Sequence, residues 1–63
     1  MTRTAAIEQA VAEVRRDGQM RQVLEDRQGS AYILRHITAG SDITVATVEK
    51  ISELGQVVKV TER

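Results

Sequence analysis

The stretch from Met20 to Gly40 constrains the fold most, because its centre, Asp26 to Gly29, has a sequence that suits two different turns. One turn would join two short helices, and the other would close a β-hairpin. The segments on either side have clearer local preferences. The fold of the whole chain therefore depends on how this turn bends.

As helices, residues 20–37 form a helix-turn-helix. The first apolar residues, from Met20 onward, recur at i, i+3 and i+4, which is the spacing of one helix face. After the turn, Ser30 is a suitable N-cap for a second short helix that would bury Leu34 and Ile37. The outward side of this second helix would consist of Ala31, Tyr32, Arg35 and His36.

As a hairpin, the same stretch has Asp26 first and Gly29 last in a type I turn followed by a bulge. The aromatic and β-branched residues of the segment 32–34 favour a strand. The alternation is poor, because Val23 and Leu24 are adjacent apolar residues that would point to opposite faces. The order would then be helix, strand, strand, helix, strand, with a right-handed crossover into a three-stranded sheet.

The N-terminal segment predicts a helix over residues 4–17. Thr4 is a suitable N-cap, and Gly18 stands at the usual stop position after two arginines. The apolar residues follow the helical spacing i, i+3, i+4, i+7 and are Ile7, Ala10, Val11 and Val14.

The C-terminal third predicts a helix over 44–54 and a strand over 56–61. Thr44 is a suitable N-cap, and Gly55 ends the pattern. The buried stripe of this helix would be Val45, Val48, Ile51 and Leu54. A lone strand leaves backbone groups without partners, so it should pair with a second copy or with an internal hairpin. The residues expected at such a dimer interface are Val57, Val58 and Val60.

The size and composition of the chain narrow its class. Its 63 residues form a single domain, 1–63, near the lower limit for a self-sufficient core, which favours a homodimer. There is no Cys and no apolar run long enough to span a membrane, so a cytoplasmic protein without membrane association is expected. A single Tyr is the only aromatic residue, which argues against a stacking platform for single-stranded nucleic acid.

Catalytic and metal chemistry have little support in the sequence. His36 is the only histidine, and the Asp and Glu residues match no ligand spacing. A domain of this size also has little room for a pocket. We therefore expect no enzymatic activity, no catalytic residues, no metal site and no cofactor.

Positive charge is concentrated in the central stretch, although the formal net charge of the chain is zero. Five arginines between Arg15 and His36 stand against three acidic residues, which gives a local net charge of 5 − 3 = +2. A basic stretch of this kind is typical of a surface that contacts phosphates.

Several residues of this frame resemble a known family. Met20 to Val23, Ser30, Leu34, Ile37 and Gly40, followed by the segment 43–55, are similar to the Xre and phage Cro type of helix-turn-helix protein. The resemblance covers residues 6–60 and is nearest to short phage repressors and antitoxins of addiction modules. In the turn, Gln28 and Gly29 depart from the family pattern of glycine followed by an apolar residue. Membership would imply binding of a DNA operator as a dimer, and autoregulation of a neighbouring gene.

The first hypothesis is therefore a mainly α protein of about four helices with a C-terminal strand. It would act as a dimeric, sequence-specific DNA-binding transcriptional regulator that inserts the helix 30–37 into the major groove of double-stranded DNA. The candidate DNA contacts are Arg21, Ser30, Ala31, Tyr32, Arg35 and His36. The antitoxin forms would add a toxin or another protein as a partner.

The alternative hypothesis is an α+β protein with the helix-hairpin-helix-strand order. It would be a small protein-interaction module without DNA binding, such as an antitoxin-like or phage-encoded inhibitor that binds through its sheet edge or acidic helix.

Overall fold

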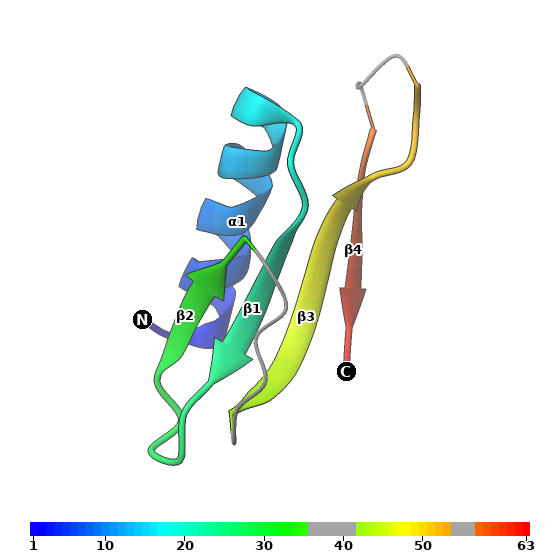
Figure 1. Ribbon diagram of the computed structural model, residues 1–63. Coiled ribbons are helices and arrows are strands. Elements are labelled where there is room, and N and C mark those ends of the chain that lie inside the picture. The colour runs from blue at the N-terminus through cyan, green and yellow to red at the C-terminus, as the bar shows by residue number, and fades with distance from the viewer. Residues whose placement is uncertain (36–41, 54–56) are drawn as a thin grey trace.

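The computed structural model describes residues 1–35, 42–53 and 57–63, and these form one helix packed against a four-stranded antiparallel sheet (Figure 1). The elements, in chain order, are α1 (Arg3–Asp17), β1 (Arg21–Glu25), β2 (Ala31–Leu34), β3 (Ile43–Lys50) and β4 (Val58–Glu62). The order of the strands in the sheet is β2-β1-β3-β4. The protein is therefore α+β, and the prediction of a mainly α fold with about four helices is wrong.

Residues 20–37 do not form a helix-turn-helix, because β1 and β2 pair as an antiparallel hairpin. The Asp26 carboxylate closes the turn, since its Oδ1 accepts hydrogen bonds from the backbone N–H of Gln28 at 2.8 Å and of Ser30 at 3.0 Å. Gly29 has a φ of +82°, which a residue with a Cβ adopts only with strain. An Asx turn followed by a left-handed glycine returns the chain antiparallel to itself. His36 and Ile37, the end of the predicted second helix, lie outside the described residues.

The predicted helix over 44–54 is also wrong, because the strand β3 occupies its first seven residues. β3 lies between β1 and β4, where β-branched residues pack well, and most of its residues are Val, Ile or Thr. The register with β1 shifts by one residue at Val23 and Leu24, so β3 contains a bulge at Val45. The bulge allows the adjacent Val45 and Ala46 to join the same core. As a result, the apolar residues of β3 are spaced along the sequence as in a helix, although the segment is a strand.

The two ends of the chain hold the segments predicted as a helix and a strand. α1 begins one residue before the predicted start, with Thr2 as its N-cap: Thr2 Oγ1 accepts from the backbone N–H of Ala5 at 3.2 Å. Gly18 ends it with a φ of +76° and donates its N–H to Val14 O at 2.7 Å. β4 overlaps the predicted strand, but it pairs with β3 in an antiparallel hairpin rather than through a right-handed crossover.

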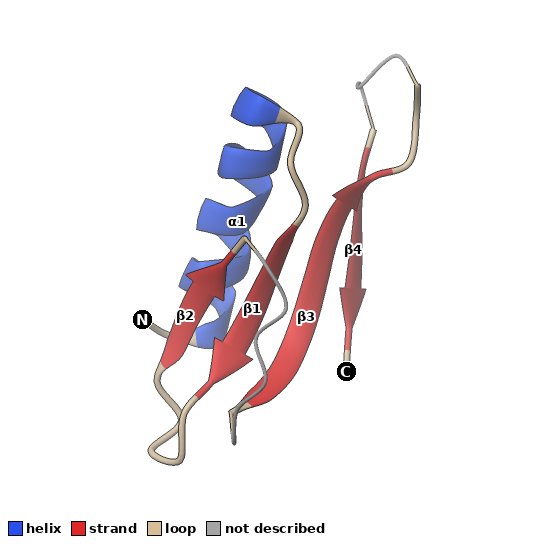
Figure 2. Cartoon of the chain, in the orientation of Figure 1, coloured by secondary structure: helices blue, strands red, loops and turns tan. Residues whose placement is uncertain are grey.

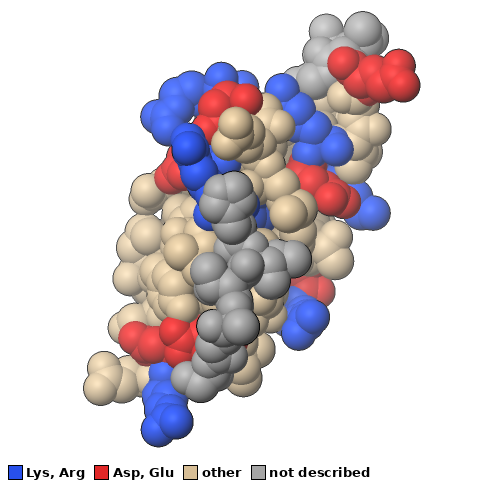
Figure 3. Space-filling view, viewed as in Figure 1, with Lys and Arg blue, Asp and Glu red and all other residues tan. Residues whose placement is uncertain are grey.

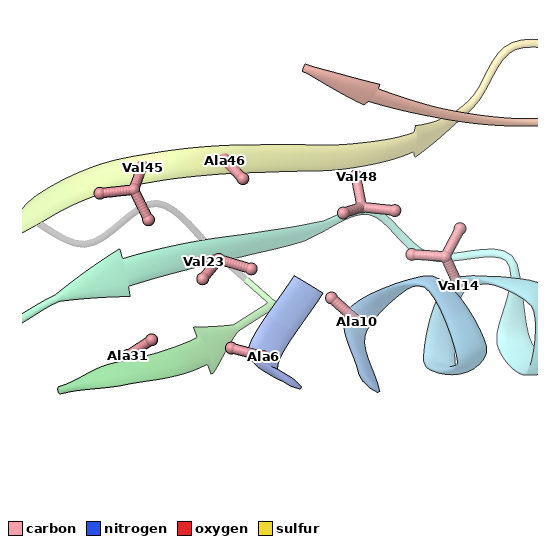
Figure 4. Close-up of a cluster of buried hydrophobic side chains, with 8 residues drawn as sticks. All are labelled: Ala6, Ala10, Val14, Val23, Ala31, Val45, Ala46 and Val48. Carbon is pink, nitrogen blue, oxygen red and sulfur yellow. The ribbon is translucent and has the colours of Figure 1, made fainter. Parts of the chain in front are cut away.

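The core lies between α1 and one face of the sheet and consists of small side chains (Figure 4). Its members are Ala6, Ala10, Val14, Val23, Ala31, Val45, Ala46 and Val48. Alanine on the helix lets its backbone approach the sheet closely, which suits a chain that lacks Phe and Trp. Leu24 is buried but belongs to the opposite face, because it follows Val23 directly in β1.

The helix covers only part of the sheet. α1 lies beside β2 and β1, whereas β4 is the strand farthest from it (Figure 2). The strand order makes β2 and β4 the two edges of the sheet. The protein therefore has one edge near the helix and one edge away from it.

We expect Gly18→Ala to lower the free energy of unfolding by about 1 kcal/mol, because a Cβ disfavours the positive φ at this position. The added Cβ would lie 2.8 Å from Lys50 Nζ, the end of a flexible side chain that can move aside. Gly29→Ala is the matched control, since Gly29 also has a positive φ but no atom within 4 Å of an added Cβ. Urea denaturation should give similar losses for both variants. A much larger loss for Gly18→Ala would show that Lys50 is held in place.

Candidate functional site

Arg21, the first of the predicted DNA contacts, lies inside the protein. Its side chain is 1% exposed and sits on the sheet face that α1 covers. The guanidinium donates from Nε to Glu13 Oε1 at 3.0 Å, from Nη1 to the carbonyl oxygen of Gln19 at 2.7 Å, and from Nη2 to Asp17 Oδ2. A charge this well buried needs such partners. Arg21 therefore joins the end of α1 to β1 and is not presented to a phosphate.

Asp17 is the centre of this ion-pair cluster. It accepts from Arg21 and also from Arg35 Nη2, at 3.1 Å from Asp17 Oδ2. The hydrogen bond from Arg21, followed by one from the backbone N–H of Gln19, lowers the pKa of Asp17 from 3.8 to about 2. The pKa of Glu13 is lowered as well, first by its hydrogen bond with Gln9 and then by Arg21. The cluster thus holds both carboxylates in their charged form.

The other predicted DNA contacts do not share one surface. Ser30 is exposed in the hairpin turn, Ala31 is 3% exposed in the core, and Arg35 is an exposed residue paired with Asp17. Tyr32 points to the opposite face of the sheet from Ala31. Its hydroxyl donates to Asp42 Oδ2, and this bond raises the pKa of Tyr32. His36 lies outside the described residues. The strand separates residues that a helix would have brought together.

The ion-pair cluster was not predicted from the sequence, although one signal for it was present. Glu13 and Asp17 are four residues apart, which places two negative charges on the same side of a helix. That arrangement is unfavourable unless a cation lies between them. Arg21 is the next arginine after Asp17 in the sequence, and the chain can fold back to place it beside these two carboxylates.

The predicted dimer residues lie on or beside the edge strand β4. Val57 and Val60 are 47% and 37% exposed, and Val58 is half-buried. Val58 and Val60 face Lys50 and Val48 of β3 in the register, and Val48 belongs to the core. The side chains of Val58 and Val60 therefore lie on the face of the sheet that carries α1.

The backbone of β4 offers an open row of hydrogen-bonding groups. Arg63 N donates to Val45 O at 2.9 Å, and Ile51 N donates to Val57 O at 3.3 Å. The backbone N–H and C=O groups of residues 57 and 63 therefore point toward β3. In an antiparallel pair every second residue points toward the partner strand. Residues 59 and 61 therefore also point toward β3. The N–H and C=O groups of Val58, Val60 and Glu62 point away from β3, outward in the plane of the sheet.

The opposite edge, β2, is short and partly covered. The backbone N–H of Ala31 donates to Met1 O at 2.8 Å, and the amino group of Met1 donates to Ala31 O at 3.3 Å. The backbone O of Ser30 accepts from Asp26 N on the β1 side. Because the direction alternates along a strand, the backbone N–H and C=O groups of Ala31 and Ile33 point away from β1. Met1 therefore occupies half of this edge. The open edge of the sheet is β4.

The charges on the visible face of the molecule do not gather into a region of one sign (Figure 3). On the face shown in Figure 3, Lys and Arg side chains are interspersed with Asp and Glu side chains. Among the described residues there is no pocket and no group of three or more His, Asp or Glu side chains that could hold a metal ion. In the same part of the chain, no helix is long and apolar enough to cross a membrane. The open edge of β4 is the feature best suited to binding.

Comparison with known proteins adds no relative: no family model matches the chain, and no curated protein or solved structure is similar enough to count as a match.

We expect Arg21→Ala to lower the urea midpoint clearly more than Arg35→Ala. Arg21 is enclosed and holds both Glu13 and Asp17, whereas the side chain of Arg35 is 56% exposed and, among the described residues, forms an ion pair with Asp17 only. An exposed ion pair contributes little to stability. Equal midpoints for the two variants would contradict the role assigned to Arg21.

The stability of the protein should fall as the pH drops from about 4 to about 2. The pKa of Asp17 is about 2 in the folded protein and 3.8 in its ordinary state, so the unfolded chain takes up the proton first. The contribution of ionised Asp17 is complete above pH 4 and is lost as the pH falls through the folded pKa. Asp17→Asn removes this contribution. The urea midpoints of the two proteins should differ most near neutral pH and converge near pH 2, and a difference that persists at pH 2 would refute this assignment.

Proposed function

We propose that this chain is a small, non-enzymatic protein-interaction module that binds an extended segment of polypeptide along β4. The open backbone row of Val58, Val60 and Glu62 is the observation that supports it. Addition of a strand to a sheet edge is a common mode of peptide recognition, in which backbone hydrogen bonds supply affinity and alternate side chains supply specificity.

The composition of β4 suits this role. The strand contains no proline, and three of its five residues are Val or Thr, so it holds an extended conformation well. Lysine on an edge strand often discourages pairing with other chains. Here Lys59 faces Glu49 of β3 in the register, and this opposite charge weakens that protection.

The side chains on the α1 side of β4 would supply the apolar contacts. Val60 is 37% exposed although its neighbour in the register, Val48, is fully buried. A strand added beside β4 would place its own side chains next to Val58 and Val60. Burial of these valines would add a hydrophobic contribution to the backbone hydrogen bonds.

The DNA-binding hypothesis has no comparable support among the described residues. The helix that was to enter the major groove is replaced by β2, and Arg21 is enclosed in the ion-pair cluster. The remaining exposed candidates, Ser30 and Arg35, belong to different segments of the hairpin.

The proposal predicts that Val60→Pro abolishes binding and leaves the fold intact. The N–H of Val60 points away from β3, so proline removes no hydrogen bond within the sheet but blocks the edge. The probe is a phage-displayed library of seven-residue peptides selected on the immobilised wild-type protein. Enriched peptides should bind the wild type and fail to bind Val60→Pro.

Amide hydrogen exchange then locates the bound peptide. In the peptide-free monomer, at dilute concentration, the amides of Val58, Val60 and Glu62 should exchange fast, and those of Lys59 and Thr61 slowly. An enriched peptide should slow exchange at the first three positions. Arg27→Ala, a change in the exposed hairpin turn, is the matched control and should bind as the wild type does. Peptides that bind Val60→Pro equally well, or that protect other amides, would overturn the proposal.

A further inference from the structure

We infer that the strand bound along β4 is β4 of a second copy of this chain, in an antiparallel pair with Val60 facing Val60 across a two-fold axis. The inference rests on the proposed function, since it needs the edge of β4 to accept a strand.

The geometry of the edge is compatible with self-pairing. In an antiparallel pair related by a two-fold axis perpendicular to the sheet, the faces that carry α1 lie on the same side of the combined sheet. Two residues that face each other across the pair must therefore have side chains on the same face. Val58, Val60 and Glu62 share one face and also carry the outward backbone groups. Pairs among these residues are therefore hydrogen-bonded pairs, which exchange N–H and C=O bonds in both directions.

One register uses the whole strand. With Val60 opposite Val60, Val58 faces Glu62 of the second copy, and all five residues of β4 are paired. Lys59 then faces Thr61 of the second copy, so no like charges meet. Such a register contains three hydrogen-bonded pairs, centred on the axis.

The registers shifted by two residues are less favourable. One places Lys59 against Lys59 of the second copy, and the other places Lys59 against Arg63. Like charges directly opposite in a sheet are destabilising. Each shift also pairs only three of the five residues of β4 with β4 of the second copy. Charge and overlap therefore select the same register.

The packing on the α1 side also favours a second copy. Val48 and Val60 are neighbours in the register, and the axis would extend this pair into a row of four valines across the two sheets. In the single chain Val48 is fully buried and Val60 is partly exposed, because the row of valines ends at the edge of the sheet. Both helices would lie on the same face of an eight-stranded sheet, with the valine row between them.

The overall charge and size of the chain agree with this partner. The formal net charge is zero, so two copies do not repel each other strongly. A chain of 63 residues has a small core and gains from added burial. A strand pairing with few side-chain contacts buries less than about 1,200 Å², which is typical of a weak, concentration-dependent dimer.

Charge substitution at the axis tests the dimer. Analytical ultracentrifugation of the wild type should show a monomer–dimer equilibrium. Val60→Lys and Val60→Glu should each be monomeric at concentrations where the wild type is mostly dimeric, because each places like charges opposite each other. An equimolar mixture of the two variants should recover a heterodimer, which also shows that both are folded. Ile43→Lys is the control, because Ile43 is 64% exposed and lies at the start of β3, away from the β4 edge.

Single cysteines test the register, since the chain contains no cysteine of its own. Facing residues of a hydrogen-bonded pair are about 5.5 Å apart at Cα, within reach of a disulfide, whereas diagonal residues are beyond it. Val60→Cys should therefore form a disulfide-linked dimer on mild oxidation much faster than Lys59→Cys or Thr61→Cys. Faster linkage of either of these two variants would replace the inferred register with a shifted one and overturn the inference.

The outcomes separate the inference from the proposed function. A wild type that stays monomeric at millimolar concentration, or a mixture of the charged variants that does not associate, overturns the dimer. If selected peptides still bind β4 in that case, strand addition stands and its partner is another chain. A dimer that Val60→Lys leaves unchanged would place the interface elsewhere and overturn the inference as well.

Discussion

The fold depends on the Asp26 carboxylate, which accepts two backbone N–H groups and so closes the turn between β1 and β2. Once this turn returns the chain antiparallel to itself, Val23 and Ile33 face each other on one side of the hairpin. This side gives α1 an apolar surface to cover, and β3 then adds to the free edge of β1. A few hydrogen bonds within five residues thus select the sheet over the helical alternative.

The interior shows how a chain without Phe or Trp fills its volume. The helix presents alanine where it lies closest to the sheet, and among the described residues the largest fully buried side chain is that of Arg21. Its long stem occupies space that an aromatic ring would fill elsewhere, and its charge is balanced by carboxylates from α1. One residue therefore combines packing and electrostatic functions that larger proteins divide among several side chains.

The sequence contained enough information to locate the first helix, the hairpin turn and the last strand, but not to choose between the two folds. Val23 and Leu24 argued against a strand because adjacent apolar residues break alternation. β1 is buried on both faces, so both residues are buried and alternation is not required. The bulge at Val45 disguised β3 in a similar way, since the spacing of its apolar residues depends on pairing with β1, which is distant in sequence.

The candidate site was only partly predictable for the same reason. Val57, Val58 and Val60 were expected at an interface because a lone strand needs partners; in the folded chain β3 is such a partner for β4, and the interface between copies stays a prediction. Arg21 was assigned to a surface because its partners come from α1, and only the folded chain brings them together. The need of a strand for a partner follows from its own backbone, whereas the role of Arg21 follows from tertiary contacts that the sequence does not show.

The pairing of Met1 with Ala31 has a consequence for assembly. A sheet with two open edges can add copies without end, and such growth produces fibres. Here the β2 edge is short and half occupied by Met1, so the described part of the chain offers no second edge equivalent to β4 on which growth could continue. A two-fold pair consumes both open edges at once, and the resulting particle is closed. The backbone pairing of Met1 thereby limits the size of any assembly that would form through β4.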